Sequence, residues 1–480
     1  MLSSKLAFNS LFLLVAKGFT FGSSFLASLI IIRYRGLADY GQFSFVFAFI
    51  SLFSVLASLS LEPIVIRHLA QSAASPEETL GNALWARISA GLGSMVLVLL
   101  IIPFFPYDAV LKNEIRVGSL SLLFGAGLVL SAYFQARLLT RSIAYTDGVS
   151  SVLLLAGMAA AVWSRIDLLW LFFFQALFPL AQSLLLLCVY RSNTGLWPNI
   201  RLRLGEVWKL VLEARPLLFA NLFIILNLRL DQLLIFHFLG SRETGIYAGL
   251  ARITELWNFV PTILMASAYP LLCKMHAGNS ALFQAGRRGI FRLLSWIVFP
   301  IPLLITMFRE KIIFLAYGAP AAAGAPTLAV LIWSVVFVFL GIGNSTALTA
   351  AGLQAYLLPL TLTGGLSNLL LNLWFIPSYG IWGAAVATVI SYSIPGLFLQ
   401  YLIKPTRPYV AEYIASLVRP GCAILPLCAL WWFQPDRPVL AAAAGMGMYA
   451  LAACRTWRLS SPLEFLRALE APANDLKKTE

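Results

Sequence analysis

Long apolar stretches separated by short polar breaks run through the whole chain. Runs longer than about 18 residues recur, and each is long enough to cross a hydrocarbon core of about 30 Å as a helix. This pattern predicts membrane-spanning helices at residues 10–32, 42–66, 82–104, 116–136, 143–163, 167–190, 214–237, 246–272, 289–308, 326–350, 356–376, 380–402, 411–433 and 438–456. The longest connection, 190–213, is basic and amphipathic at its end, which is typical of a linker at the membrane surface.

A pattern of glycines repeats along the chain at a constant offset of 204 residues. Gly36, Asp39, Gly41 and Phe43 correspond to Gly240, Glu243, Gly245 and Tyr247. In both copies an acid precedes the second glycine by two residues, and an aromatic residue follows it by two. Repeats of this length within a membrane protein are typical of transporters.

The repeat predicts an all-α polytopic membrane protein of about fourteen helices in two similar lobes. We expect a six-helix N-terminal lobe at 1–190, an interfacial linker at 191–213, a six-helix C-terminal lobe at 214–403, two extra helices at 404–456 and a polar tail at 457–480. Since the offset spans six helices, an even number, both lobes have the same orientation. A pseudo-twofold axis then runs along the membrane normal, with a cavity between the lobes.

Composition supports a membrane protein and excludes a soluble one. Of the 480 residues, 60% are hydrophobic and 11% are charged, whereas soluble proteins average about 25% charged residues. The net charge of +14 is spread between the apolar runs, so it indicates positive-inside loops and not nucleic-acid binding. With the N-terminus inside, twenty Lys and Arg residues fall on the inner side and nine on the outer, which predicts that both termini are cytoplasmic.

Catalytic, cofactor and metal motifs are missing from the sequence. The five cysteines lie in or beside apolar runs without a C-x-x-C pair, and there are three histidines, so no metal site is predicted. No phosphate-binding GxxxxGK[ST], D-x-D or G-x-S-x-G motif occurs. The longest outer loop, near 103–116, is too short to house an active-site domain. We therefore expect a transporter without a cofactor, not an enzyme.

A few charged residues fall inside the predicted spans, where each costs about 2.5–3.5 kcal/mol on insertion scales. The candidates for a functional role are Lys17, Glu62, Arg229, Asp231, Arg252 and Glu255. The helices that carry them, predicted spans 1, 2, 7 and 8, are the ones matched by the repeat. In a two-lobed carrier, such equivalent helices would face one another across the central cavity.

Arg252 and Glu255 are three residues apart and so share a helix face. They are either a pair that neutralises itself for insertion, or an anion contact in which Glu255 holds Arg252 or accepts a proton. Arg229 and Asp231 point about 200° apart, which suggests that Asp231 pairs with another helix. Either residue could be structural.

Two further charges lie nearer the ends of their spans. Lys17 could reach the inner interface, but it lies about two turns inside its span, which favours a position in the cavity. Glu62 is close to the inner end of its span, where we expect it to pair with Arg67.

Three cations in one cavity, Lys17, Arg252 and Arg229, would suit a diphosphate or an acidic sugar. Polar amides in later spans could hydrogen-bond sugar hydroxyls or join helices, with Glu255, Asp231 and Glu62 left for ion coupling or charge pairing. These amides are Asn221, Asn227, Asn344, Asn368 and Asn372.

Several motifs resemble a known family in order and spacing. They are G-L-A-D-Y-G-Q-F at 36–43, L-G-S-R-E-T-G-I-Y at 239–247, P-x-x-x-x-A-x-x-x-P-L-L at 261–272 and Y-G-I-W-G-A-A-V-A-T at 379–388. The chain resembles the polysaccharide transporter family, the O-antigen or oligosaccharide flippase branch of the multidrug/oligosaccharidyl-lipid/polysaccharide exporter superfamily. The resemblance extends over nearly the whole chain.

The resemblance implies a flippase that works by alternating access. Its substrate would be an undecaprenyl-diphosphate-linked oligosaccharide, turned from the cytoplasmic to the outer leaflet of the bacterial inner membrane. A polysaccharide polymerase and a chain-length regulator are implied as partners. The related lipid II flippase has cavity cations on spans 1, 2 and 8, and Lys17 and Arg252 lie on two of these spans. Span 2 departs from that pattern, because it offers only Glu62 and Arg67 near its end.

Two other functions remain open from the sequence. A multidrug and toxin extrusion antiporter of the same superfamily would favour cationic substrates and an acidic lumen. A polytopic glycan polymerase or ligase would usually carry a large outer loop. The predicted spans hold at least as many cations as acids, and no such loop is present, so the flippase fits best.

Overall fold

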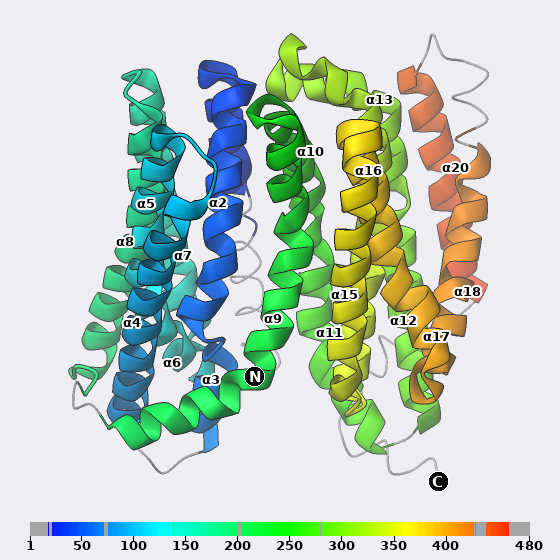
Figure 1. The fold of residues 1–480 in the computed structure, drawn as a ribbon. Coiled ribbons are helices and arrows are strands. Elements are labelled where there is room, and N and C mark those ends of the chain that lie inside the picture. The colour runs from blue at the N-terminus through cyan, green and yellow to red at the C-terminus, as the bar shows by residue number, and fades with distance from the viewer. Residues whose placement is uncertain are drawn as a thin grey trace. The chain divides into compact units, whose positions relative to one another are not determined.

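The structure, a computed structural model, describes residues 18, 22–71, 75–137, 139–199, 203–278, 280–426, 428 and 438–459, and these residues form helices without any β-strand (Figure 1). The predicted all-helical class is therefore confirmed. Eight helices in the described part are long and apolar enough to cross a membrane, and a ninth is formed if the pair Ala319–Leu331 and Ser334–Ala350, bent by 43°, is one span. The chain is a multi-pass membrane protein.

The helices of the structure match the fourteen predicted spans in different ways. The predicted spans 356–376 and 380–402 both lie in Gln354–Leu402, and the backbone leaves helical geometry between them at Gly380, with φ 63° and ψ −147°. Predicted span 246–272 is divided between two helices and a short 3-10 turn. Residues 10–17 and 19–21 of the first predicted span lie outside the described residues.

The helices group into two compact units with different boundaries from the predicted lobes. The first unit comprises residues 1–259, 316–324 and 369–384, and the second comprises 260–315, 325–368 and 385–480. The predicted division into lobes at 190 and 214 remains a prediction.

The described part of the first unit includes a helix at 22–35. It continues with α2 (Leu37–Ser58), α3 (Glu62–Gln71), α4 (Pro76–Ile101), η1 (Ile102–Phe104), α5 (Ala109–Phe124), η2 (Gly125–Leu130), α6 (Ser131–Ala136), α7 (Thr140–Trp163), α8 (Leu168–Thr194), α9 (Leu204–Leu239), α10 (Ser241–Glu255), η3 (Leu256–Asn258) and η4 (Ala319–Gly324). Local sequence sets several of these starts. The Ser75 hydroxyl accepts from the Glu78 amide with Pro76 at the first helical position of α4, and the Asp108 carboxylate accepts from the Leu111 amide at the start of α5.

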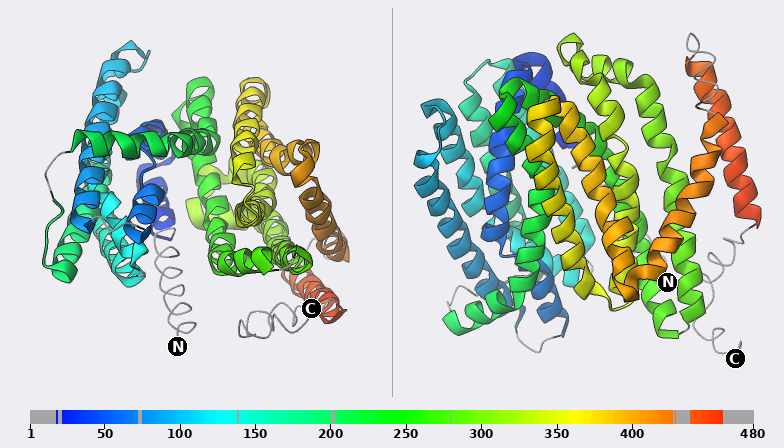
Figure 2. Two further views of the ribbon diagram at one scale, coloured as in Figure 1. Left: turned by 90° about the horizontal axis from the view of Figure 1, so that it is seen from below. Right: turned by 45° about the vertical axis from the view of Figure 1, so that its right-hand side comes forward.

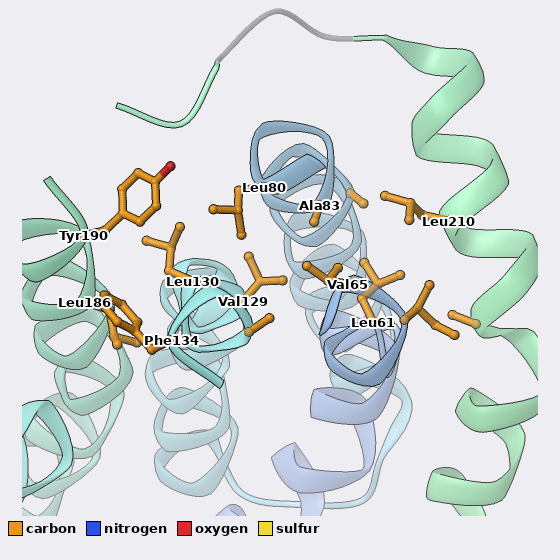
Figure 3. Close-up of a cluster of buried hydrophobic side chains, with 14 of the residues drawn as sticks. Leu61, Val65, Leu80, Ala83, Val129, Leu130, Phe134, Leu186, Tyr190 and Leu210 are labelled. Atoms are coloured by element: carbon orange, nitrogen blue, oxygen red, sulfur yellow. The ribbon is translucent and has the colours of Figure 1, made fainter. Parts of the chain in front are cut away.

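A buried apolar cluster holds one end of the first unit together (Figure 3). It joins α3, α4, η2, α6, α8 and α9 through side chains that include Leu61, Val65, Leu80, Val129, Leu130, Phe134, Leu186, Tyr190 and Leu210. Burial of large apolar side chains contributes about 1.5–3 kcal/mol each, so this cluster fixes the helix ends near Leu61 firmly.

The linker predicted at the membrane surface is bound to that same end. The first part of α9 lies crosswise to α4 before the helix, which contains Pro216, turns (Figure 1; left view of Figure 2). Arg203 pairs with Glu78 through two nitrogens at 2.9 Å, and Asn199 donates its amide to the Glu77 carbonyl at 2.9 Å. A Cβ on Gly81 would lie 1.8 Å from the Asn199 carbonyl oxygen, so only glycine permits this contact.

The second unit is built from α11 (Phe259–Gly278), α12 (Ser280–Val298), α13 (Pro300–Tyr317), α14 (Ala325–Leu331), α15 (Ser334–Ala350), η5 (Gln354–Tyr356), α16 (Leu357–Ile394), η6 (Pro395–Leu399), α17 (Gln400–Leu402), η7 (Lys404–Thr406), α18 (Arg407–Ala423) and α20 (Pro438–Leu459). Residues 369–384 of α16 and 316–317 of α13 belong to the first unit. Polar contacts join the helices of the second unit to one another. Arg287 of α12 pairs with Glu412 of α18 at 2.6 Å and stacks over the Tyr409 ring.

Candidate substrate cavity

The two copies of the glycine repeat lie against each other within the first unit. Gly36, before α2, has φ 95° and ψ 174°, and Gly240, before α10, has φ 88° and ψ −177°. This conformation is open to glycine and strained for other residues. Equivalent positions thus share an unusual backbone geometry, which supports the duplication inferred from sequence.

The second glycine of each copy is the point where α2 and α10 cross. A Cβ on Gly41 would lie 1.7 Å from the Ser241 carbonyl oxygen, and a Cβ on Gly245 would lie 1.9 Å from the Leu37 carbonyl oxygen. Leu37 and Ser241 are themselves 204 residues apart. The contact is therefore reciprocal, as expected of a twofold-related pair, and the two backbones touch without side chains between them.

A cavity of about 370 Å³ opens in the first unit beside this crossing. Its walls come from residues 23–28 and from α2, α4, α5, η2, α7, α8 and α10. The volume falls within the range of sites for small organic ligands. Two arginines, Arg87 and Arg252, and eight serines are among the lining residues, and the described lining contains no aspartate or glutamate. The cavity surface is mainly apolar, and its charged lining residues are both positive.

Several lining serines are oriented by their own helices. The hydroxyls of Ser51, Ser54 and Ser58 on α2 donate to the carbonyls of Ala48, Ser51 and Val55 at 2.7–3.0 Å. A hydroxyl whose proton is used in this way keeps its oxygen lone pairs as acceptors. This wall is therefore suited to ligand hydroxyl donors, such as those of a sugar.

Arg252 joins the cavity to a cluster of three charges. Its guanidinium lies 2.9 Å from Glu255, and the other Glu255 oxygen lies 3.2 Å from Arg229. Both guanidinium carbons also lie within 6 Å of the Phe47 ring centre, at 5.4 Å for Arg229 and 5.8 Å for Arg252. The predicted pairing of Arg252 with Glu255 is present. Because one carboxylate faces two guanidinium groups, the cluster carries a net charge of +1.

The other predicted site residues are placed differently. Lys17 lies outside the described residues. Asp231 is buried and accepts hydrogen bonds from the Tyr247 hydroxyl at 2.6 Å and the Asn372 amide at 2.7 Å. It therefore joins α9 to α10 and α16, which agrees with the expectation that it pairs with another helix. Arg229, on the same helix, points instead to Glu255.

The expected pairing of Glu62 with Arg67 is wrong. Glu62 accepts hydrogen bonds from Ser131 at 2.7 Å and Gln135 at 2.5 Å, and Arg67 pairs with Glu213 at 2.8 Å. Sequence spacing favoured the near neighbour in the chain, but the start of α9 crosses α3 and brings Glu213 to Arg67.

Four of the five asparagines join polar groups distant in the chain. Asn221 donates to Ser60, Asn344 exchanges two hydrogen bonds with Gln400, Asn368 donates to Ser391, and Asn372 donates to Asp231. The helix-joining alternative is the one that these contacts favour.

Two buried or cavity-lining charges escaped the sequence reasoning. Arg87 lies near the start of the predicted span 82–104, where a cation is expected to reach the membrane surface, yet it lines the cavity. Glu114 precedes a predicted span, yet it is only 1% exposed and accepts from Gln42 at 2.6 Å. An extension of the predicted span 116–136 by one turn would have placed Glu114 within the membrane.

Replacement of Tyr247 by phenylalanine tests the Asp231 cluster. The variant removes one of the two buried hydrogen bonds described to Asp231, and a hydrogen bond to a charged group contributes about 1.5–3 kcal/mol. We expect a lower thermal unfolding midpoint in detergent, with substrate affinity unchanged. Tyr145→Phe, at an exposed tyrosine of α7, is the matched control. An unchanged midpoint in Tyr247→Phe would show that this cluster does not stabilise the first unit.

Comparison with known proteins gives the same class of protein. An uncharacterized membrane protein of Methanocaldococcus jannaschii is 23% identical over 177 residues, which cover 36% of this chain and 35% of that protein. The chain thus spans about a third of the length of this relative. Among solved structures, the lipid II flippase MurJ in an inward closed conformation has a TM-score of 0.71 at 14% identity, covering 93% of this chain and 99% of that one.

A second solved structure, an inward-facing multidrug resistance MATE family transporter of the MOP superfamily, has a TM-score of 0.63 at 12% identity and covers 83% of this chain and 95% of that one. These likenesses establish the fold. Residues 6–276, more than half of the chain, match the family model described as polysaccharide biosynthesis protein. The chain therefore belongs to the polysaccharide biosynthesis protein family and has the fold of the MOP-superfamily transporters.

Proposed function

We propose that this protein is a flippase for a lipid-linked oligosaccharide. The substrate would be an undecaprenyl-diphosphate-linked O-antigen or other surface polysaccharide unit, moved from the cytoplasmic to the outer leaflet of a bacterial inner membrane. Both termini would face the cytoplasm, as the count of Lys and Arg favours. A polymerase and a chain-length regulator would then act on the exported unit.

The observation that carries this proposal is the charge of the cavity. Arg252 and Arg87 line it, and its described lining offers no carboxylate to a cationic drug. A diphosphate would compensate these cations by charge-assisted hydrogen bonds, and the positive charge of Arg229 would contribute at longer range. The serine hydroxyls of α2 offer acceptors to sugar hydroxyls.

Alternating access would then move the headgroup while the polyprenyl tail stays in the lipid. The headgroup enters the cavity from the cytoplasmic side and leaves on the other side after the α2–α10 crossing separates. Glu255, which faces two arginines, is the acid best placed to link a proton or other ion to this cycle. Asp231 would serve mainly to join helices, because its hydrogen bonds are made to Tyr247 and Asn372.

The variant Arg252→Ala tests the proposal. We expect export of the lipid-linked glycan to fall at least about tenfold, the equivalent of about 1.4 kcal/mol of lost binding. Protein abundance should hold, because Glu255 keeps its second partner, Arg229, at 3.2 Å. The measurement is the surface glycan and the lipid-linked intermediate retained in the inner leaflet, in cells that carry each variant as the sole copy.

The matched control is Arg242→Ala on the same helix. Arg242 is 63% exposed and lies 3.7 Å from Glu243, a surface pair that contributes about 0–1 kcal/mol. It should export normally. Normal export by Arg252→Ala would remove Arg252 from the substrate site, and efflux of a cationic dye without glycan export in the unaltered protein would favour the antiporter.

A further inference from the structure

A second cation lies in the same cavity, away from Arg252. Arg87 on α4 lines the cavity, and its Nε atom is buried and has no hydrogen-bond partner in the part of the chain that the structure describes. An arginine inside a membrane span is costly and needs a compensating group. The fork of guanidinium donors matches a phosphate or carboxylate.

The nearby acid does not satisfy Arg87 by hydrogen bonding. The negative charge of Glu62 favours the charged form of Arg87. The Oε1 atom of Glu62, however, accepts hydrogen bonds from Ser131 and Gln135. Glu62 is not among the residues that line the cavity. The carboxylate therefore offsets part of the charge, and the buried Nε of Arg87 is left without a hydrogen-bond partner among the described residues.

The two arginines lie toward opposite ends of the cavity. Arg252 lies beside Tyr40 and the Phe47 ring, in the first half of α2. Arg87 lies near Glu62, just beyond the last residue of α2, Ser58. Tyr40 and Ser58, which both line the cavity, are about 27 Å apart along the helix at 1.5 Å per residue. The serine wall of α2 lies between them.

We infer that Arg87 is a second anion-binding site, which receives the diphosphate of a lipid-linked substrate before Arg252 does. The inference rests on the proposed function, since the count of Lys and Arg makes the Ser58 end the cytoplasmic one. Transfer between two sites of moderate affinity avoids a single site of very high affinity, from which the headgroup would dissociate slowly. Sugar hydroxyls would follow along Ser51 and Ser54.

Binding of farnesyl diphosphate to the full-length protein in phosphatidylcholine nanodiscs tests this site, with inorganic pyrophosphate as the second probe. We expect Arg87→Gln to weaken farnesyl diphosphate binding at least about tenfold at low salt, and Arg87→Lys to weaken it less, because it keeps the charge but not the fork. Arg137→Gln, the same change at an exposed arginine after α6, should bind like the unaltered protein.

The double variant Glu62→Gln, Arg87→Gln separates binding from charge balance. If Arg87 only offsets Glu62, the double variant binds as tightly as the unaltered protein, and the site is overturned. If Arg87 binds the diphosphate, the double variant regains stability but not affinity. It also serves as the test where Arg87→Gln alone folds poorly.

The remaining outcomes distinguish this site from the proposed function. Full affinity in Arg87→Gln, together with lost affinity in Arg252→Ala, would overturn the Arg87 site and leave the flippase standing. Failure of the unaltered protein to bind either probe would overturn both. Equal affinity for inorganic pyrophosphate would assign Arg87 to free phosphate and overturn its role for a lipid headgroup.

Discussion

Alanine at Gly41 or at Gly245 is expected to lower transport at least about tenfold. Each added Cβ would lie within 2 Å of a carbonyl oxygen of the opposite helix, 1.7 Å from Ser241 for Gly41 and 1.9 Å from Leu37 for Gly245. Backbone atoms cannot rotate away as a side chain can, so α2 and α10 must separate. Overpacking costs typically about 1–3 kcal/mol, and this free energy would oppose the conformation in which the crossing is closed.

The measurements are glycan export and the labelling of a cysteine introduced at Ala248, a buried residue of α10 on the turn after Gly245. We expect faster labelling by a membrane-impermeant thiol reagent in the alanine variants. Gly93→Ala is the matched control, because in the described part of the chain no atom beyond its chain neighbours and its own helix backbone lies within 4 Å of the added Cβ, and alanine favours an α-helix. Slow labelling and normal export in both Gly41→Ala and Gly245→Ala would show that the helices do not need this close approach.

The helical fold and the duplication could be predicted from the sequence for a physical reason. Apolar runs reveal spans because the bilayer demands internally satisfied helices. The glycine repeat was visible because Gly36 and Gly240 need a left-handed backbone, and Gly41 and Gly245 need close contact. The boundaries were harder to predict, since a 3-10 turn within a span, such as Leu256–Asn258 in the predicted span 246–272, is not marked by the length of the apolar run.

The candidate site could be predicted only where its contacts are local. Arg252 and Glu255 are three residues apart, and their pairing follows from helix periodicity. Arg87 could not be identified as a cavity residue, because its environment is made by helices distant in the chain. The pairing of Arg67 with Glu213, 146 residues away, was missed for the same reason.

Asp231 and Arg252, two charged residues of the first unit, have different roles. Asp231 is buried and lies among donors from other helices, so its charge serves the packing of α9. Arg252 pairs with Glu255 and also lines the cavity, so its positive charge can attract an anion that enters the cavity. Glu255 and a bound anion then compete for Arg252, and this competition sets the affinity of the cavity for its substrate.

Replacement of Glu255 by glutamine should therefore lower the stability of the protein and raise its affinity for a diphosphate. The variant leaves Arg229 and Arg252 without the carboxylate that now lies 3.2 Å and 2.9 Å from them. Loss of one partner of a buried pair costs about 3–5 kcal/mol, and we expect the lower part of this range because both arginines are partly exposed. A diphosphate can replace the missing charge, so farnesyl diphosphate should bind at least about tenfold more tightly.

The measurement is the thermal unfolding midpoint with and without farnesyl diphosphate. A ligand at a hundred times its Kd stabilises by about 2.7 kcal/mol, so the tighter site of Glu255→Gln should show the larger rise in midpoint. Export should slow, because release is now the costly step. Glu310→Gln, at a residue 76% exposed, is the control and should change neither quantity. If ligand stabilises Glu255→Gln no more than the unaltered protein, the bound anion does not contact the Arg229–Arg252 pair, and the diphosphate must be held elsewhere.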